Sequence, residues 1–249
     1  MTTEMVVLPT PAAVAAEAAD AFVMAARDAV LHRGRFLVAL SGGRTPHTAF
    51  HMLRAAPRVE QIAWDKVEIL WSDERAVPPE DPASNYGAAR ESLLDHLPGL
   101  RPEAVHRMRG ESADLDAAAR DYEDELREVT GAGLDDVPTL DLVWLGMGTD
   151  GHTASLCPGD DALKVTDRLV VATWPPGYDT PRLTLTYPVL NAAREATFLV
   201  VGADKAETLN AVRRGADLPA GRVLAARTSW LVDAAAAGQL ASPPAARPA

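Results

Sequence analysis

The sequence predicts a single-domain α/β protein with a mostly parallel, Rossmann-like sheet and helices on both of its faces. Short apolar runs, each about as long as a buried strand, alternate with segments of helical character along most of the chain. No internal repeat, linker or change of composition divides the 249 residues. Alternating strands and helices are typical of a parallel sheet that is covered on both sides. We therefore expect one domain over residues 1–240 and a disordered tail over residues 241–249.

The N-terminal half contains the clearest helix boundaries. Thr10 is a candidate N-cap, and Pro11 takes the first position of an Ala-rich helix that Gly34 ends. The turn Ser41–Gly43 separates an apolar run from a helix that Pro46 begins. We expect strands at 4–8, 35–40, 66–72 and 105–108, and helices at 11–32, 46–55, 85–96 and 112–130.

The C-terminal half is predicted to continue this alternation. Residues 139–145 (TLDLVWL) form a buried strand in this prediction and lead into a glycine-rich turn. We expect further strands at 169–173, 182–186, 196–201 and 223–226, and helices at 204–213 and 229–237. In such sheets ligands bind beyond the carboxyl ends of the strands. The loops that follow residues 40, 72 and 145 are therefore the candidate site.

Composition and charge restrict the partners of the chain. The formal net charge is −11 and the pI is about 5.0, so the basic field that nonspecific nucleic-acid binding requires is missing. An acidic protein that binds an anion must gather positive charge in a cleft, although solubility alone also explains an acidic balance. Cys157 is the single cysteine, no uncharged apolar run reaches the ~20 residues of a membrane span, and the N-terminus lacks signal-peptide features. We expect a cytoplasmic protein that binds neither nucleic acid nor membrane.

The first loop, Leu40–Pro46 (LSGGRTP), has features of a phosphate site. Gly42 and Gly43 let the backbone approach a ligand, and the start of the following helix presents N–H groups that lack helical partners. The Gly-Lys-Ser/Thr ending of a Walker A loop is missing. An ordinary strand-to-helix turn would explain the same residues equally well.

The second loop carries Asp73, Glu74 and Arg75 directly after a predicted strand. Two acids and an arginine at this point can position sugar hydroxyls or a reacting centre. A solvated charged loop is the alternative. Three prolines within the loop stiffen it and argue for a fixed shape.

The third loop, Gly146–Thr153 (GMGTDGHT), matches G-x-G-x-x-G literally. A dinucleotide site is excluded, because Cys157–Gly159 interrupts the helix that this fingerprint needs and the next strand does not end in an acid. His152 lies close to Asp150 at a strand end. An imidazole, with an ordinary pKa of ~6.5, can act as a base and then as an acid near neutrality. The loop therefore offers His152 as a catalytic group.

Three other candidate centres lack part of their motif. No G-x-S-x-G elbow is present for a serine hydrolase. His47 and His51 have the i, i+4 spacing of a zinc pair, but Thr48 replaces the glutamate of H-E-x-x-H and no third ligand is evident. Cys157 precedes a proline and has no base beside it in the sequence. We therefore expect neither a metal nor a covalent thiol.

Five segments together resemble 6-phosphogluconolactonases in order and wording. They are LSGGRTP (40–46), SDERAVPPEDPASNYG (72–87), LGMGTDGHTASLCPG (145–159), PRLTLT (181–186) and VVGADKA (200–206). The wider group includes glucosamine-6-phosphate deaminases, which share the Gly-Gly-x-Thr-Pro and Asp-Gly-His blocks. The resemblance extends over most of the chain. It implies hydrolysis of a phosphosugar lactone, 6-phosphogluconolactone, to 6-phosphogluconate in the oxidative pentose phosphate pathway, with no cofactor.

The same resemblance implies roles for individual residues. His152 is expected to take a proton from the attacking water and return it to the departing ring oxygen, with Asp150 orienting the imidazole and Asp73 as a further catalytic candidate. Backbone N–H groups near Gly148 to Gly151 are candidates for holding the oxyanion. The phosphate is expected at Gly42, Gly43, Arg44, Thr45, Arg182 and Lys205. The sugar end is expected near Glu74, Arg75 and Asn85.

Two other functions compete with this hypothesis. An amino-sugar phosphate isomerase or deaminase needs a carboxylate that moves a proton between adjacent carbons, and Asp73 could supply it. Family deaminases resemble one another in an Asn-Glu-Pro stretch after the Asp-Gly-His block, where this chain has Ser155–Pro158 (SLCP), so the lactonase is favoured. A noncatalytic sugar-phosphate sensor normally carries a DNA-binding segment, which this acidic chain lacks. The sequence leaves the oligomeric state open between a monomer and a small homo-oligomer.

Overall fold

Six parallel strands form the central sheet, in the order β1-β9-β8-β5-β2-β3. The computed structural model describes residues 1–238, so the tail expected over 241–249 lies outside the described residues. The parallel sheet confirms the predicted α/β class. Its strands are β1 (Thr2–Leu8), β2 (Phe36–Leu40), β3 (Val67–Trp71), β5 (Leu142–Leu145), β8 (Glu195–Val200) and β9 (Arg227–Asp233).

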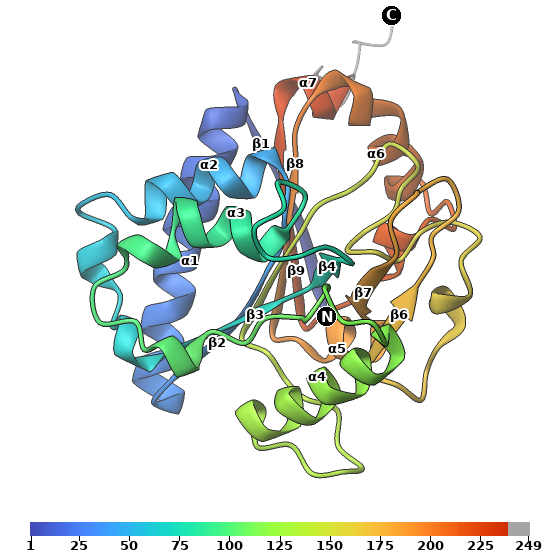
Figure 1. Ribbon diagram of the computed structural model, residues 1–249. Helices are drawn as coiled ribbons and strands as arrows, with labels where there is room; N and C mark the ends of the chain where they lie inside the picture. The colour runs from blue at the N-terminus through green and yellow to red at the C-terminus, as the bar shows by residue number, and fades with distance from the viewer. Residues whose placement is uncertain (239–249) are drawn as a thin grey trace, which may run out of the picture.

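Helices cover both faces of this sheet, as Figure 1 shows. Phe36, Val38 and Leu40 of β2 pack into one core, and Leu37 and Ala39 pack into the other. Because both faces are buried, the strands read as continuous apolar runs in the sequence. One face carries α1 (Pro11–Arg33), α2 (Arg44–Leu53) and α3 (Asn85–Ser92), and the other carries α4 (Leu115–Thr130), α5 (Tyr187–Ala192), α6 (Ala206–Arg213) and α7 (Ala234–Ala237).

The helix ends follow from local chemistry. The Thr10 side chain accepts a hydrogen bond from the backbone N–H of Ala13 at 3.1 Å, and Gly34 ends α1 in the left-handed region at φ 78°. At the start of α3, the Ser84 hydroxyl accepts from the N–H of Gly87 at 2.9 Å. These caps fix the lengths of helices that pack beside the sheet. No helix within residues 1–238 is both long and apolar enough to cross a membrane.

A second, antiparallel sheet lies beside the carboxyl end of β3. Its strands, in spatial order, are β4 (Asp73–Arg75), β7 (Arg182–Leu185) and β6 (Val170–Thr173). Ser72 joins the two sheets, because its N–H donates to Leu40 O of β2 at 2.8 Å and its carbonyl accepts from Leu185 N of β7 at 2.9 Å. The chain therefore leaves the central sheet immediately before Asp73. The sequence does not predict β4, which is three residues long and fully charged.

The structure corrects the predicted C-terminal elements. Residues 223–226 form no strand, and most of the expected helix at 229–237 is strand β9. Only Ala234–Ala237 is helical. β9 pairs with β1 on one side and β8 on the other, and this pairing outweighs the helix propensity of the adjoining alanines. Likewise, the strand expected at 105–108 is reduced to a single bridge between Ile69 and Val105.

His106 forms a buried ion cluster on the α4 side of the sheet. Its Nδ1 donates to Glu125 at 2.9 Å and its Nε2 donates to Glu68 at 3.0 Å. Two carboxylates accept from the two ring nitrogens, so the imidazole carries both protons. Burial by itself disfavours the charged ring, but the hydrogen bonds from Glu125 and Glu68 outweigh it and raise the pKa of His106.

Replacing His106 by Gln should destabilise the protein most at mildly acidic pH. A raised folded-state pKa gives stability that is complete below the unfolded-state pKa of ~6.5 and is lost as the pH rises through the folded-state pKa. We expect the free energy of unfolding to fall by about 1–3 kcal/mol near pH ~6 and by less near pH ~9. Urea denaturation at both pH values measures this, with the exposed His32→Gln as a control. An equal loss at both values would show that His106 is uncharged in the folded protein.

Candidate active site

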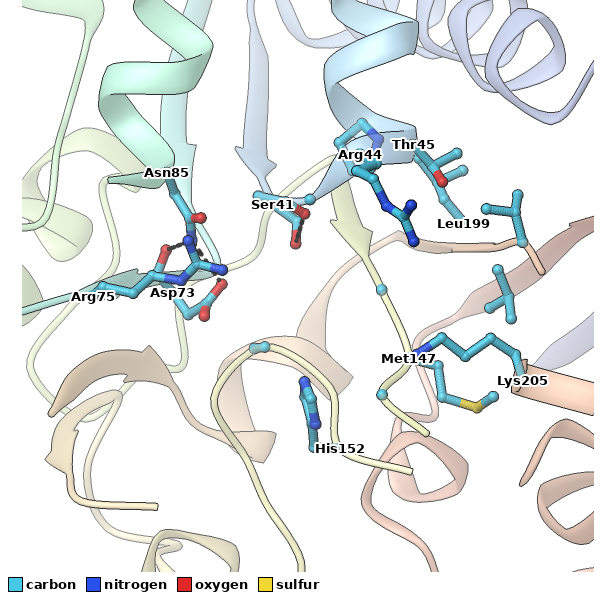
Figure 2. A pocket seen from close by; sticks show the side chains of 18 of the residues that line it. Ser41, Arg44, Thr45, Asp73, Arg75, Asn85, Met147, His152, Leu199 and Lys205 are labelled. Atoms are coloured by element: carbon cyan, nitrogen blue, oxygen red, sulfur yellow. Dashed lines mark hydrogen bonds between the residues drawn. The ribbon is translucent and has the colours of Figure 1, made fainter. Parts of the chain in front are cut away.

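A cavity of about 260 Å³ opens at the carboxyl edge of the central sheet (Figure 2). Loops that follow β2, β4, β5 and β8 line it, at the place where parallel sheets bind ligands. Most of the site residues expected from the sequence meet there. Those that line the cavity are Gly42, Gly43, Arg44, Thr45, Asp73, Arg75, Asn85, Gly148, His152, Arg182 and Lys205. Glu74, Asp150 and Gly151 are not among the lining residues.

The start of α2 forms one wall of the cavity. Gly43 is its N-cap with φ 110°, a left-handed value that favours glycine, and no side chain caps the helix. The N–H groups of Arg44 and Thr45 are therefore available to an anion at the positive end of the helix dipole. A Cβ at Gly42 would lie 1.7 Å from Asn85 Oδ1, so only glycine lets α3 pack against this loop.

Positive side chains enter the cavity from opposite sides. Figure 2 shows Arg44 and Lys205 on one side, Arg75 on the other and His152 between them. Arg75 of β4 lies directly opposite Arg182 of β7, an unfavourable pairing of like charges unless an anion joins them. The Nε atoms of both arginines are buried and have no hydrogen-bond partner among the described residues. The positive side chains that line the cavity are therefore compatible with an anionic ligand.

His152 and Asp150 form a hydrogen-bonded pair. Nδ1 of His152 lies 2.7 Å from Oδ1 of Asp150, which also accepts from the backbone N–H of His152 at 3.1 Å. A carboxylate only accepts, so Nδ1 carries a proton, and in the neutral ring Nε2 has the lone pair. Partial burial opposes the charge on Asp150, but the hydrogen bonds from His152, together with the positive charge of the protonated ring, lower the pKa of Asp150. Nε2 takes part in none of the hydrogen bonds found within residues 1–238 and is available as a base at the cavity.

The backbone N–H groups of Gly148 and Gly151 already have partners within the loop. The N–H of Gly148 donates to the carbonyl of His152 at 2.9 Å, and the N–H of Gly151 donates to Gly148 O at 3.1 Å. Both donors are therefore occupied inside the loop. Gly148 instead gives the pair room, because a Cβ there would lie 2.1 Å from His152 Nδ1 and 2.4 Å from Asp150 Oδ1.

Glu74 anchors the wall of the cavity instead of contacting a ligand. It is 2% exposed, and its carboxylate accepts from the backbone N–H groups of Arg75, Asn85 and Tyr86 at 2.7–2.8 Å and from the Ser84 hydroxyl at 3.0 Å. Burial raises the pKa of Glu74, while these backbone hydrogen bonds act in the opposite direction. Both carboxylate oxygens of Glu74 therefore accept hydrogen bonds that fix the start of α3 to β4.

Asp73 lines the cavity, but its carboxylate is already held by the protein. Oδ2 accepts from the Ser155 hydroxyl at 2.7 Å, and Oδ1 lies 3.3 Å from Asn85 Nδ2 and 3.4 Å from the Ser72 hydroxyl. Ser155 is fully buried and also accepts from Arg182 at 3.4 Å. Asp73 therefore orients polar side chains around the cavity.

Sequence reasoning did not identify Ser155 or Tyr178 as site residues. Ser155 lies three positions after His152, and this closeness to the Asp-Gly-His block was the available signal. Tyr178 lies in the Pro- and Gly-rich segment between β6 and β7, and its hydroxyl is 3.1 Å from His152 Nδ1. Nothing in the local sequence indicates this contact, because it joins loops 26 positions apart.

One group of side chains resembles a metal site in its geometry. Donor atoms of Asp150, His152 and Cys157 lie within 4.8 Å of one another. Burial raises the pKa of Cys157 to about 12, so the free thiol is protonated near neutrality. Nδ1 of His152 is engaged by Asp150, and this hydrogen bond is the geometry of an acid–base pair.

Comparison with known proteins decides the family. Residues 9–232 match the family described as glucosamine-6-phosphate isomerases/6-phosphogluconolactonase. The chain belongs to this family. It is 37% identical over 244 residues to a 6-phosphogluconolactonase of Nostoc sp., covering 94% of this chain and 97% of that protein. It is 37% identical over 251 residues to a 6-phosphogluconolactonase of Mycobacterium tuberculosis, covering 97% and 100%.

A solved structure of a 6-phosphogluconolactonase supports the same family assignment. The 6-phosphogluconolactonase from Trypanosoma cruzi superimposes with a TM-score of 0.84 at 25% identity, over 96% of this chain and 97% of that one. The family fold therefore extends through both sheets, including the strands that carry Asp73 and Arg182.

Replacing Gly148 by Ala should separate His152 from Asp150, because the added methyl overlaps both side chains. Proton NMR should show a downfield resonance of the hydrogen-bonded Nδ1–H, which His152→Ala identifies by its loss. We expect Gly148→Ala to lose this resonance while circular dichroism stays unchanged. Gly146→Ala is the matched control, since its Cβ would meet nothing within 4 Å. Persistence of the resonance in Gly148→Ala would contradict the steric role.

Proposed function

We propose that this chain hydrolyses 6-phospho-D-glucono-1,5-lactone to 6-phospho-D-gluconate in the oxidative pentose phosphate pathway. The observation that carries the proposal is the His152–Asp150 pair, whose free Nε2 adjoins a cavity lined by Arg44, Arg182 and Lys205. The relatives named 6-phosphogluconolactonase support it. The proposal includes a cytoplasmic location, in keeping with a single, unpaired cysteine, and small molecules as the only ligands.

The phosphate of the substrate binds at the start of α2. The N–H groups of Arg44 and Thr45 point their dipoles at it, and the side chains of Lys205 and Arg182 neutralise its charge. Binding this remote group holds the lactone carbonyl near His152, which replaces a random encounter with a fixed orientation. The hydroxyls of the sugar face the polar wall formed by Asp73, Arg75 and Asn85.

His152 then moves one proton through the reaction. Nε2 takes a proton from water as the water oxygen bonds to C1, and the carbonyl electrons become an oxyanion. When the oxyanion collapses, the bond between C1 and the ring oxygen breaks, and the imidazolium gives its proton to that oxygen. Asp150 keeps Nδ1 protonated and stabilises the imidazolium between the two steps. The product acid ionises to the carboxylate and releases one proton to solvent.

Asp73 is less suited to the chemistry of the related isomerases and deaminases. A carboxylate that moves a proton between carbons needs an oxygen directed at the substrate. Both Asp73 oxygens instead adjoin donors from Ser155 and Asn85. Family members that act on amino sugars thus share the fold with this chain, while its arrangement favours hydrolysis.

The first experiment measures the loss of freshly generated 6-phosphogluconolactone above its spontaneous rate. Wild-type protein should accelerate the loss equally with and without EDTA, and His152→Ala should lower kcat about 100- to 10,000-fold. Asp150→Asn should also lower kcat, because it removes the charge that supports the imidazolium. His32→Ala, which alters an exposed histidine outside the cavity, is the control. A wild-type protein without effect, but active on glucosamine-6-phosphate, would overturn the proposal.

Arg182→Ala should chiefly weaken substrate binding. Removing a charged contact to phosphate is expected to raise KM about 10- to 100-fold with a smaller change in kcat. Arg213→Ala, an exposed arginine outside the cavity, is the matched control and should leave both constants unchanged. An unchanged KM in Arg182→Ala would remove this residue from the phosphate site.

A further inference from the structure

The segment between β6 and β7 places one aromatic side chain against the catalytic histidine. Tyr178 Oη lies 3.1 Å from Nδ1 of His152, and the two rings meet edge to face at 90° with centroids 5.8 Å apart. Tyr178 is 37% exposed, so its position is not explained by burial in the core. The contact is with the catalytic side chain itself.

The hydroxyl of Tyr178 is placed to accept from the proton on Nδ1. That proton already points to Asp150 Oδ1 at 2.7 Å, and the phenol oxygen offers a second acceptor at 3.1 Å. Burial, followed by the charge of Asp150, raises the pKa of Tyr178, so the phenol stays neutral near pH ~7. Two acceptors on one N–H restrict rotation of the ring and direct Nε2 to the cavity.

The ring of Tyr178 supports a second functional group. The guanidinium carbon of Arg182 lies 4.4 Å from the ring centroid, within the range of a cation–π interaction. On its other side, Arg182 donates to the Ser155 hydroxyl at 3.4 Å. Arg182 is thus held between Tyr178 and Ser155, while its Nε has no hydrogen-bond partner among the described residues.

We propose that Tyr178 is a positioning residue that fixes the distance between the general base and the anion-binding arginine. Its hydroxyl orients His152, its ring orients Arg182, and the two effects are separable because they use different parts of the side chain. The proposal rests on the proposed lactonase function and adds a residue to that site. One side chain then fixes the position of the bound phosphate relative to that of the reacting carbonyl.

Two substitutions separate the hydroxyl from the ring. Tyr178→Phe keeps the aromatic face for Arg182 and removes only the hydroxyl, whereas Tyr178→Leu removes both. Trp174→Ala is the matched control, because Trp174 is a 62% exposed aromatic residue in the same segment and does not line the cavity. Lactone turnover gives kcat and KM, and calorimetry with inorganic phosphate gives Kd without any reaction.

Tyr178→Phe should lower kcat about 3- to 10-fold and leave both KM and the phosphate Kd unchanged. Tyr178→Leu should show the same loss of kcat and, in addition, raise the phosphate Kd about 3- to 10-fold. The phenyl ring that Tyr178→Phe retains is therefore expected to preserve phosphate binding, but not kcat. Trp174→Ala should match wild type in all three constants.

A wild-type kcat in Tyr178→Phe would overturn the role of the hydroxyl, and equal phosphate Kd values in the Phe and Leu variants would overturn the role of the ring. Equal loss of kcat and binding in all three variants would show a general effect of the segment and overturn both. If wild-type protein turns over no lactone, the proposed function fails. Phosphate calorimetry and the Nδ1–H resonance of His152 still test Tyr178 in that case.

Discussion

The parallel ladders between β3, β2, β5 and β8 bring the carboxyl ends of four strands to one edge of the sheet. Each strand delivers a different loop to that edge, so residues more than 160 positions apart, such as Arg44 and Lys205, line one cavity. Ser72 extends this arrangement into the small antiparallel sheet through its backbone bonds to Leu40 and Leu185. The site therefore depends on backbone pairing in two sheets, because this pairing positions the side chains that line the cavity.

Electrostatics explains how a chain of net charge −11 can hold an anionic substrate. Arg44, Arg75, Arg182 and Lys205 all line the cavity, and two of them face each other across neighbouring strands. Like charges at close range repel one another, so these side chains favour the binding of an anion between them.

Several side chains shape the site without reaching the substrate. The Glu74 carboxylate accepts hydrogen bonds from the start of α3, and the Ser155 hydroxyl donates to Asp73. Because Gly148 has no side chain, the His152–Asp150 pair has room beside it. Such residues carry the same signals in the sequence as ligand-binding residues. Their roles differ because burial and hydrogen-bond saturation are properties of the folded chain.

The sequence alone determined the α/β class and the three loops at strand ends, and it predicted His152, which lines the cavity, as a candidate base. Apolar periodicity and motif spacing are local properties, so the sequence carries them. It failed where distant segments decide the outcome. Pairing with β1 and β8 makes β9 a strand despite the alanines that follow, and pairing with β7 makes a strand of the charged residues Asp73–Arg75. Only the tertiary structure could place Tyr178 between His152 and Arg182. The physical reason is that these contacts join segments whose separation along the chain carries no information about their distance in space.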